Sequence, residues 1–148
     1  MNNNLTWLLV ADAGKARIFS LHKAKLFSDI EQTGLLSLIN EFTHHESRMK
    51  NMDLVTSKRG ESGLNSLGSD RPKHHEAEVF AHQLMEQLNT ARIDHHFQDL
   101  ILIAPPAFMG ILNKHMPNEI HKLISKKIEK DYTQESLNDL TKKLVTHL

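Results

Sequence analysis

The sequence predicts an α/β fold in which helices flank a mixed sheet, and three observations support this class. Short apolar runs of strand length alternate along the chain with segments of helical period. The 148 residues match the size of one domain, so we expect residues 1–148 to fold as a single unit. Hydrophobic residues make up 39% of the chain, which is enough to fill a core at this size.

The first third of the chain predicts three strands. Trp7–Ala11 is a continuous apolar run bounded by Asp12 and Gly14, which is typical of a strand buried on both faces. Ala16–His22 follows directly after this turn and is therefore expected to form its hairpin partner. Leu35–Thr43 alternates imperfectly between apolar and polar residues and predicts a third strand.

The middle of the chain predicts a long helix followed by a buried strand. Apolar residues beyond Pro72 recur with helical spacing, and Glu76 and Glu78 suit the positive end of a helix dipole. The apolar stripe of this helix consists of Ala77, Phe80, Ala81, Leu84, Leu88 and Ala91. Leu100–Ala104 is an aliphatic run that ends at Pro105, which predicts a central strand followed by a turn.

The last third predicts two helices and one further strand. Phe108–His115 is a short helical segment that stops before Pro117. Leu123–Lys130 fits either a helix or an edge strand, and we favour a strand that follows a helical turn. Thr133 is the expected N-cap of a final helix. The core stripe of that helix would consist of Leu137, Leu140, Leu144 and Leu148.

The composition excludes several classes of protein and site. The chain has no cysteine, which excludes disulfides, thiolate zinc sites, iron–sulfur clusters and a cysteine nucleophile. Its 18 basic side chains balance 18 acidic ones, so any attraction to a polyanion must be local. No apolar run reaches the length of a membrane span, and the first residues do not match a secretory signal. We therefore expect a cytoplasmic protein that contacts no membrane and carries no cofactor.

The segment 44–73 lacks any periodicity and is expected to be a long loop. Over this length an irregular segment is usually functional or disordered. Three acidic residues lie between Arg48 and Lys73, namely Asp53, Glu61 and Asp70. The six basic residues in the same stretch are Arg48, Lys50, Lys58, Arg59, Arg71 and Lys73. This surplus of positive charge predicts salt-dependent contact with a phosphate backbone, although a solvated surface loop is the commoner interpretation of such a segment.

Four blocks of the sequence resemble a known bacterial family. They are Leu9–Phe19, His75–Ala81, Leu102–Gly110 and Lys126–Thr133, and they cover the chain from near its start to near its end. In this order they resemble the bacterial host-attachment proteins, which are required for attachment to host cells. The resemblance implies a ribonuclease-H-like sheet flanked by helices, similar to the central domain of eukaryotic and archaeal class-one release factors and of pelota.

In those release factors a Gly-Gly-Gln loop lies between a strand and the first long helix. The matching place in this chain is the basic segment, where Lys58–Gly63, with Gly60 and Gly63, is the most similar part. This part contains neither a Gly-Gly pair nor a glutamine. The departure weakens the case for a hydrolase that acts on peptidyl-tRNA, and a shared fold does not by itself assign a function.

Two groups of residues are weak candidates for metal binding. His75, Glu78 and His82 lie within about 60° of one another on the predicted helix, opposite its apolar stripe, so a solvated face is the better interpretation. Asp12 ends the first strand, where a ribonuclease-H-like nuclease would use an acid to hold a divalent metal. Asp99 and Asp131 are possible partners, but capping of its own turn is the more common role of such an aspartate.

We expect a binding protein rather than an enzyme. The leading hypothesis is contact with ribosomal or other structured RNA through the basic segment. The first alternative is a hydrolase, either a metal-dependent nuclease that uses Asp12 or an esterase acting on peptidyl-tRNA. The second alternative follows the family name and is a factor that influences adhesion to host cells. The sequence leaves the oligomeric state open.

Overall fold

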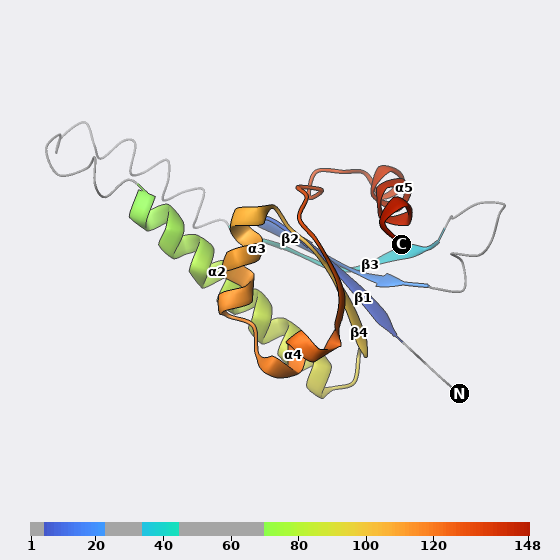
Figure 1. Ribbon diagram of the computed structural model, residues 1–148, viewed down its shortest axis with the longest axis horizontal. Coiled ribbons are helices and arrows are strands. Elements are labelled where there is room, and N and C mark those ends of the chain that lie inside the picture. Colours follow the sequence, from blue (N-terminus) through green and yellow to red (C-terminus); the bar gives the residue numbers. More distant parts are fainter. Residues whose placement is uncertain (1–4, 23–33, 45–69) are drawn as a thin grey trace, which may run out of the picture.

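The protein is an α/β structure built on one five-stranded mixed sheet, as the sequence predicts (Figure 1). The computed structural model describes residues 5–22, 34–44 and 70–148. Within these ranges the strands are β1 (Thr6–Ala11), β2 (Lys15–Leu21), β3 (Leu36–Thr43), β4 (Asp99–Ile103) and β5 (Ile124–Ile128). The helices are α2 (Asp70–Ile93), α3 (Pro106–Lys114), α4 (Asn118–Leu123) and α5 (Leu137–His147).

The strand order is β3-β2-β1-β4-β5, and it places the first strand at the centre of the sheet. β2 is antiparallel to both β1 and β3, while β4 is parallel to β1 and to β5. β1, β3, β4 and β5 therefore point the same way, and their carboxyl ends lie at one edge of the sheet. We call this the carboxyl edge; it comprises residues 12–14, 44, 104–105 and 129–131.

Two apolar layers cover the sheet, one on each face. α2, α3 and α4 cover one face, and Phe80, Leu84 and Leu88 of α2 pack there with Leu9 and Leu102 of the strands. α5 covers the other face with Leu140 and Leu144 (Figure 1). On that side these residues pack against Leu8, Val10, Phe19, Ile101 and Ile103. Continuous apolar runs are needed in β1 and β4 because both faces of these strands are buried.

The long helix begins earlier than expected, and this corrects the boundary of the predicted loop. α2 starts at Asp70, so residues 70–73 are helical. His44, the first residue of the predicted loop, is buried against the body of the protein, with 7% of its surface exposed. Pro72 marked the expected limit, but it lies in the first turn of the helix, where proline is tolerated because the backbone N–H groups of that turn have no partner within the helix.

The final helix has a different cap from the one predicted. It starts at Leu137, and the Ser136 hydroxyl accepts a hydrogen bond from the Asp139 N–H at 3.2 Å. The expected cap, Thr133, lies in the turn before it and is fully buried. The core stripe is also shorter than predicted, since Leu137 and Leu148 are about half exposed while Leu140 and Leu144 are buried.

β3 is an edge strand, and a bulge breaks its predicted alternation. The register with β2 shifts between Ile18 and Phe19, which pair with Asn40 and Leu38 and leave Ile39 as the extra residue. Leu38 and Ile39 are 51% and 44% exposed. At the opposite edge the prediction of a helical turn followed by a strand is confirmed by α4 and β5. None of the helices in the described ranges is long and apolar enough to cross a membrane.

Candidate functional site

The carboxyl edge is the part of the sheet where function is expected, because open α/β sheets bind ligands outside the carboxyl ends of their strands. The turn between β1 and β2 lies there, as do the residues that follow β3, β4 and β5. Among the predicted candidates, Asp12 and Asp131 lie at this edge. α2 also begins on this side and presents its polar residues between β3 and α3.

Asp12 closes the turn between β1 and β2. Its Oδ1 atom accepts hydrogen bonds from the backbone N–H groups of Gly14 and Lys15, both at 2.8 Å. These two bonds confirm that Asp12 caps its own turn, which is the more common role of such an aspartate. The second carboxylate oxygen, Oδ2, is 2.8 Å from the hydroxyl of Thr133, which comes from the other end of the chain.

Thr133 joins Asp12 to Asp131. Its hydroxyl oxygen is 2.8 Å from Oδ2 of Asp12 and 2.9 Å from Oδ1 of Asp131. A hydroxyl carries one proton and donates to one carboxylate at a time. The structure thus brings together two of the three carboxylates that a nuclease site would use.

The third carboxylate lies elsewhere. Asp99 begins β4 beside Thr6 of β1, and it accepts a hydrogen bond from the Thr6 hydroxyl at 3.2 Å. Asp12 follows the other end of β1, so Asp99 does not share the carboxyl edge. Among the side chains that the structure describes, which are those of residues 5–22, 34–44 and 75–148, no three His, Asp or Glu residues are placed to hold a metal ion together.

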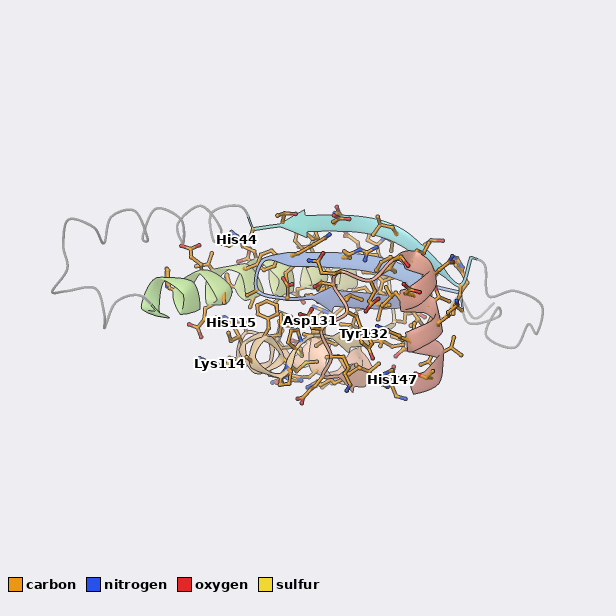
Figure 2. The ribbon with its side chains drawn as sticks, turned by 90° about the horizontal axis from the view of Figure 1, so that it is seen from above. His44, Lys114, His115, Asp131, Tyr132 and His147 are labelled. Atoms are coloured by element: carbon orange, nitrogen blue, oxygen red, sulfur yellow. The ribbon has the colours of Figure 1, made fainter. Side chains whose placement is uncertain are left out.

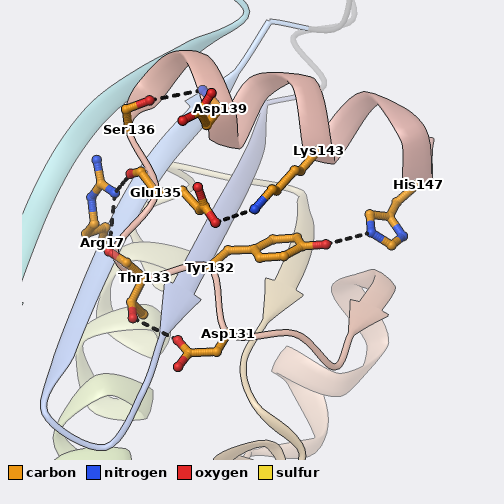
Figure 3. Close-up of polar contacts among 9 residues, drawn as sticks. All are labelled: Arg17, Asp131, Tyr132, Thr133, Glu135, Ser136, Asp139, Lys143 and His147. Atoms are coloured by element: carbon orange, nitrogen blue, oxygen red, sulfur yellow. Dashed lines mark hydrogen bonds and ion pairs between the residues drawn. The ribbon is translucent and has the colours of Figure 1, made fainter.

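The segment between β5 and α5, residues 129–136, is fastened to the first hairpin (Figure 3). The guanidinium group of Arg17 donates to the carbonyl oxygen of Glu135 at 2.7 Å and to that of Thr133 at 3.5 Å. The same guanidinium lies 5.0 Å from the ring centroid of Phe19. Arg17 and Asp12 of the first hairpin therefore both bind this short segment.

Polar contacts then tie α5 to this segment. Lys143 donates to the carboxylate of Glu135 and lies 5.0 Å above the ring of Tyr132. The hydrogen bond with Glu135 raises the pKa of Lys143 above its ordinary value. The Tyr132 hydroxyl lies 3.4 Å from Nε2 of His147 (Figure 3). These contacts link Tyr132, Glu135, Lys143 and His147 into one polar cluster beside α5.

A buried contact between a histidine and a glutamate joins the end of β3 to α2, and sequence reasoning missed it. Nε2 of His44 is 2.8 Å from Oε2 of Glu76, and the two side chains are 7% and 5% exposed. The His44 ring also stacks on Phe80, with 5.1 Å between ring centroids. His44 is the last described residue before segment 45–69, and Glu76 lies in the second turn of α2. The pair thus joins the end of β3 to α2 at the carboxyl edge.

Two grooves flank α2. The β3 groove, with a volume of about 450 Å³, lies between the end of β3 and α2. The α3 groove, of about 480 Å³, lies between α2 and the end of α3. Figure 2 shows His44 and His115, one from each groove, on opposite sides of α2.

The predicted stripe of His75, Glu78 and His82 borders the α3 groove. Glu78 accepts a hydrogen bond from Lys114 at 2.6 Å and lies 3.9 Å from Nε2 of His115. Nε2 of His82 is 2.7 Å from the carboxylate of Glu86. One side of the stripe therefore contacts the end of α3. The positions of residues around a single helix do not reveal such a contact with a second helix.

Most of the predicted RNA-binding residues lie outside the described ranges. Arg48, Lys50, Lys58, Arg59, Gly60 and Gly63 belong to this group. Arg71 and Lys73 lie in the first turn of α2. Three lysines of the later chain bind neighbours: Lys114 binds Glu78, Lys126 binds the carbonyl oxygen of His147, and Lys127 binds Asn113.

The family comparison covers nearly the whole described structure. Residues 7–144 match the model of the family described as "protein required for attachment to host cells". No curated protein matches the chain. The matched range includes the hairpin, the carboxyl edge, both grooves of α2 and most of α5. The chain therefore belongs to the family of proteins required for attachment to host cells.

Proposed function

We propose that this host-attachment family protein binds structured RNA, such as ribosomal RNA, through the basic residues of segment 44–73. The observation that supports this proposal is the buried pair of His44 and Glu76. This contact joins the residue that ends β3 to the second turn of α2, so the two described elements that flank the segment lie side by side on the sheet. Its basic residues would then reach a phosphate backbone from the carboxyl edge, where α/β proteins bind ligands.

The architecture supports the fold relationship on which this proposal draws. A mixed sheet with helices on both faces is what a ribonuclease-H-like domain would have, and the observed sheet has this form. Under the proposed relationship with release-factor central domains, a segment between β3 and α2 would be the part that meets the ribosome. A factor that influences adhesion to host cells, as the family name describes, is a separate alternative to RNA contact.

The test is RNA binding over a series of salt concentrations. Each phosphate contact contributes about 0.7 to 0.9 to the slope of log K against log salt. The double variant Lys58→Ala with Arg59→Ala should therefore lower the slope by roughly 1.4 to 1.8. The matched control is Lys122→Ala with Lys142→Ala, two exposed lysines on α4 and α5, which should leave the slope unchanged. Failure of the wild type to sediment with ribosomes at low salt would refute the proposal. Equal sedimentation of the two double variants with ribosomes would refute it as well.

A metal-dependent nuclease is the second candidate, and the approach of Asp12 and Asp131 to Thr133 favours it. The test compares RNA degradation by the wild type and by Asp131→Asn in Mg²⁺ and in Mn²⁺. The matched control is Asp139→Asn, a change on the exposed part of α5. Activity lost only in Asp131→Asn would support the nuclease, and inactivity of the wild type with both metals would retire it.

A further inference from the structure

One polar atom at the end of α3 has no partner. His115 is the C-cap of this helix, and its Nε2 atom is buried without a hydrogen bond in the part of the chain that the structure describes. Leaving a buried polar atom unsatisfied is unfavourable, so such an atom in a folded protein requires a physical reason. The function proposed above does not use this residue.

A carboxylate of α2 lies just beyond hydrogen-bonding distance of that atom. Oε1 of Glu78 is 3.9 Å from Nε2 of His115 and 2.6 Å from Nζ of the neighbouring Lys114 (Figure 2). The same oxygen thus faces two basic side chains of α3. The Lys114 side chain is 62% exposed, whereas those of His115 and Glu78 are 27% and 28% exposed. The contact between His115 and Glu78 therefore lies in the better shielded position.

The surroundings allow this contact to close. A shift of roughly 1 Å would bring Nε2 of His115 within hydrogen-bonding distance of Glu78. The α3 groove, of about 480 Å³, lies beside the two side chains and leaves room for such a shift. Glu78 has a further interaction besides the one with Lys114. A carboxylate offers about four acceptor directions, so binding of His115 does not require Glu78 to release its other partners.

The protonation state of His115 decides how strong this contact is. Histidine is the side chain that ordinarily changes its charge between about pH 5 and 8. A neutral imidazole donates from one nitrogen only, whereas an imidazolium ion donates from both. A hydrogen bond from an imidazolium ion to a carboxylate is charge-assisted, and therefore shorter and stronger than a bond between neutral groups. In mild acid Nε2 of His115 becomes a charged donor that faces Glu78.

The charges around His115 act in both directions. Lys114 and a protonated His82, whose ring centroid is 5.8 Å from that of His115, oppose a positive charge there. Glu86 lies 2.7 Å from Nε2 of His82 and offsets the charge of that ring. His75, which also lines the groove, is exposed to water. The C-terminal carbonyl groups of α3 favour a cation at the cap.

The count of these charges favours uptake of a proton. Among the described side chains that line the α3 groove, together with Lys114, two carboxylates face one lysine while the histidines are neutral. The first proton therefore enters a region of net negative charge. We propose that His115 is a proton-operated latch between two helices. In mild acid its imidazolium group binds Glu78 and fastens the end of α3 to α2, and the latch opens as the pH rises and the ring loses its charge.

The test is amide hydrogen exchange of the full chain, followed by NMR at about pH 5.5 and about pH 7.5 and corrected for intrinsic exchange rates. Relative to α5, the last turn of α3 should be protected about threefold more at the lower pH, the gain expected from one partly exposed ion pair. His115→Gln and Glu78→Gln should each abolish this gain. The matched control, His121→Gln on the exposed side of α4, should keep it.

Two further measurements separate the latch from a general effect of acid. The Nε2–H signal of His115 should be visible at the lower pH in the wild type and lost through exchange with water in Glu78→Gln. Lys114→Met should keep the gain in protection, and loss of the gain in this variant would assign the contact to the lysine and overturn the proposal. Equal protection of α3 at both pH values, or an equal gain in His115→Gln and the wild type, would refute it.

Discussion

Replacing His44 with alanine tests whether the buried pair anchors the carboxyl edge. The two side chains are 7% and 5% exposed and 2.8 Å apart, so the change leaves the Glu76 carboxylate buried without its histidine. Removing one partner of a buried hydrogen bond leaves the other group unsatisfied, which costs about 1 to 3 kcal/mol of unfolding free energy. The group left behind is a carboxylate, which is costlier to leave unsatisfied than a neutral group, so we expect a value near the upper limit, about 3 kcal/mol. For a chain of this size that lowers the Tm by roughly 6 to 12 °C.

The reverse change should cost less, and this asymmetry is informative. Glu76→Ala removes the carboxylate and leaves the buried imidazole with an unpaired donor, for about 1 to 3 kcal/mol. The double variant should then lose less unfolding free energy than the two single variants added together, because each single variant already removes the same contact between His44 and Glu76. Urea unfolding supplies all three values. The control His121→Ala removes an exposed imidazole on α4 and should stay within about 0.5 kcal/mol of the wild type. A cost for His44→Ala below about 1 kcal/mol, or strict additivity, would refute the anchoring argument.

Three further predictions concern the segment between β5 and α5. Arg17→Ala removes hydrogen bonds from a charged group to two carbonyl oxygens and should destabilise the protein by about 1.5 to 3 kcal/mol in urea unfolding, with Arg17→Lys intermediate. Thr133→Val keeps the shape of the side chain but removes the donor to Asp12, and it should lower the unfolding free energy by about 1 to 3 kcal/mol. Thr133→Ser keeps the hydroxyl and should retain most of the wild-type stability. Equal Tm values for the two variants would contradict the role of the hydroxyl. The pKa of Lys143 is raised in the folded state, chiefly by its hydrogen bond to Glu135, so its contribution to stability is fully present below pH 10.5 and lost as the pH rises through the folded value. The stability difference between wild type and Lys143→Met should therefore be constant from neutral pH to about pH 10 and shrink at higher pH; a difference that grows with pH would contradict this sign.

The sequence predicts those elements whose order of apolar and polar residues follows directly from which of their faces are buried in the sheet layers. β1 and β4 are continuous apolar runs because both their faces are covered, and α2 shows a helical stripe because one side packs on the sheet. β3 shows the limit of this logic. It is an edge strand with a bulge at Ile39, so its exposed apolar residues follow no simple period.

At the candidate site, contacts between residues close in the sequence are predictable, and contacts between distant residues are not. The capping role of Asp12 is predictable because its partners lie two and three residues along the chain. The contact of Asp12 with Thr133 spans 121 residues, and that of His44 with Glu76 spans 32, so no local pattern indicates either. Glu76 even resembles an ordinary helix-start acid. Its role becomes visible only when β3 is placed beside α2.

The cover supplied by α5 has a consequence for synthesis. Leu8, Val10 and Phe19 emerge from the ribosome early, but Leu140 and Leu144, which shield them from water, are translated more than a hundred residues later. At about 5 to 20 residues per second, that apolar surface stays uncovered for several seconds in every nascent chain. During this interval it is open to chaperones and to misassembly, and the docking of α5 is the step that ends the exposure.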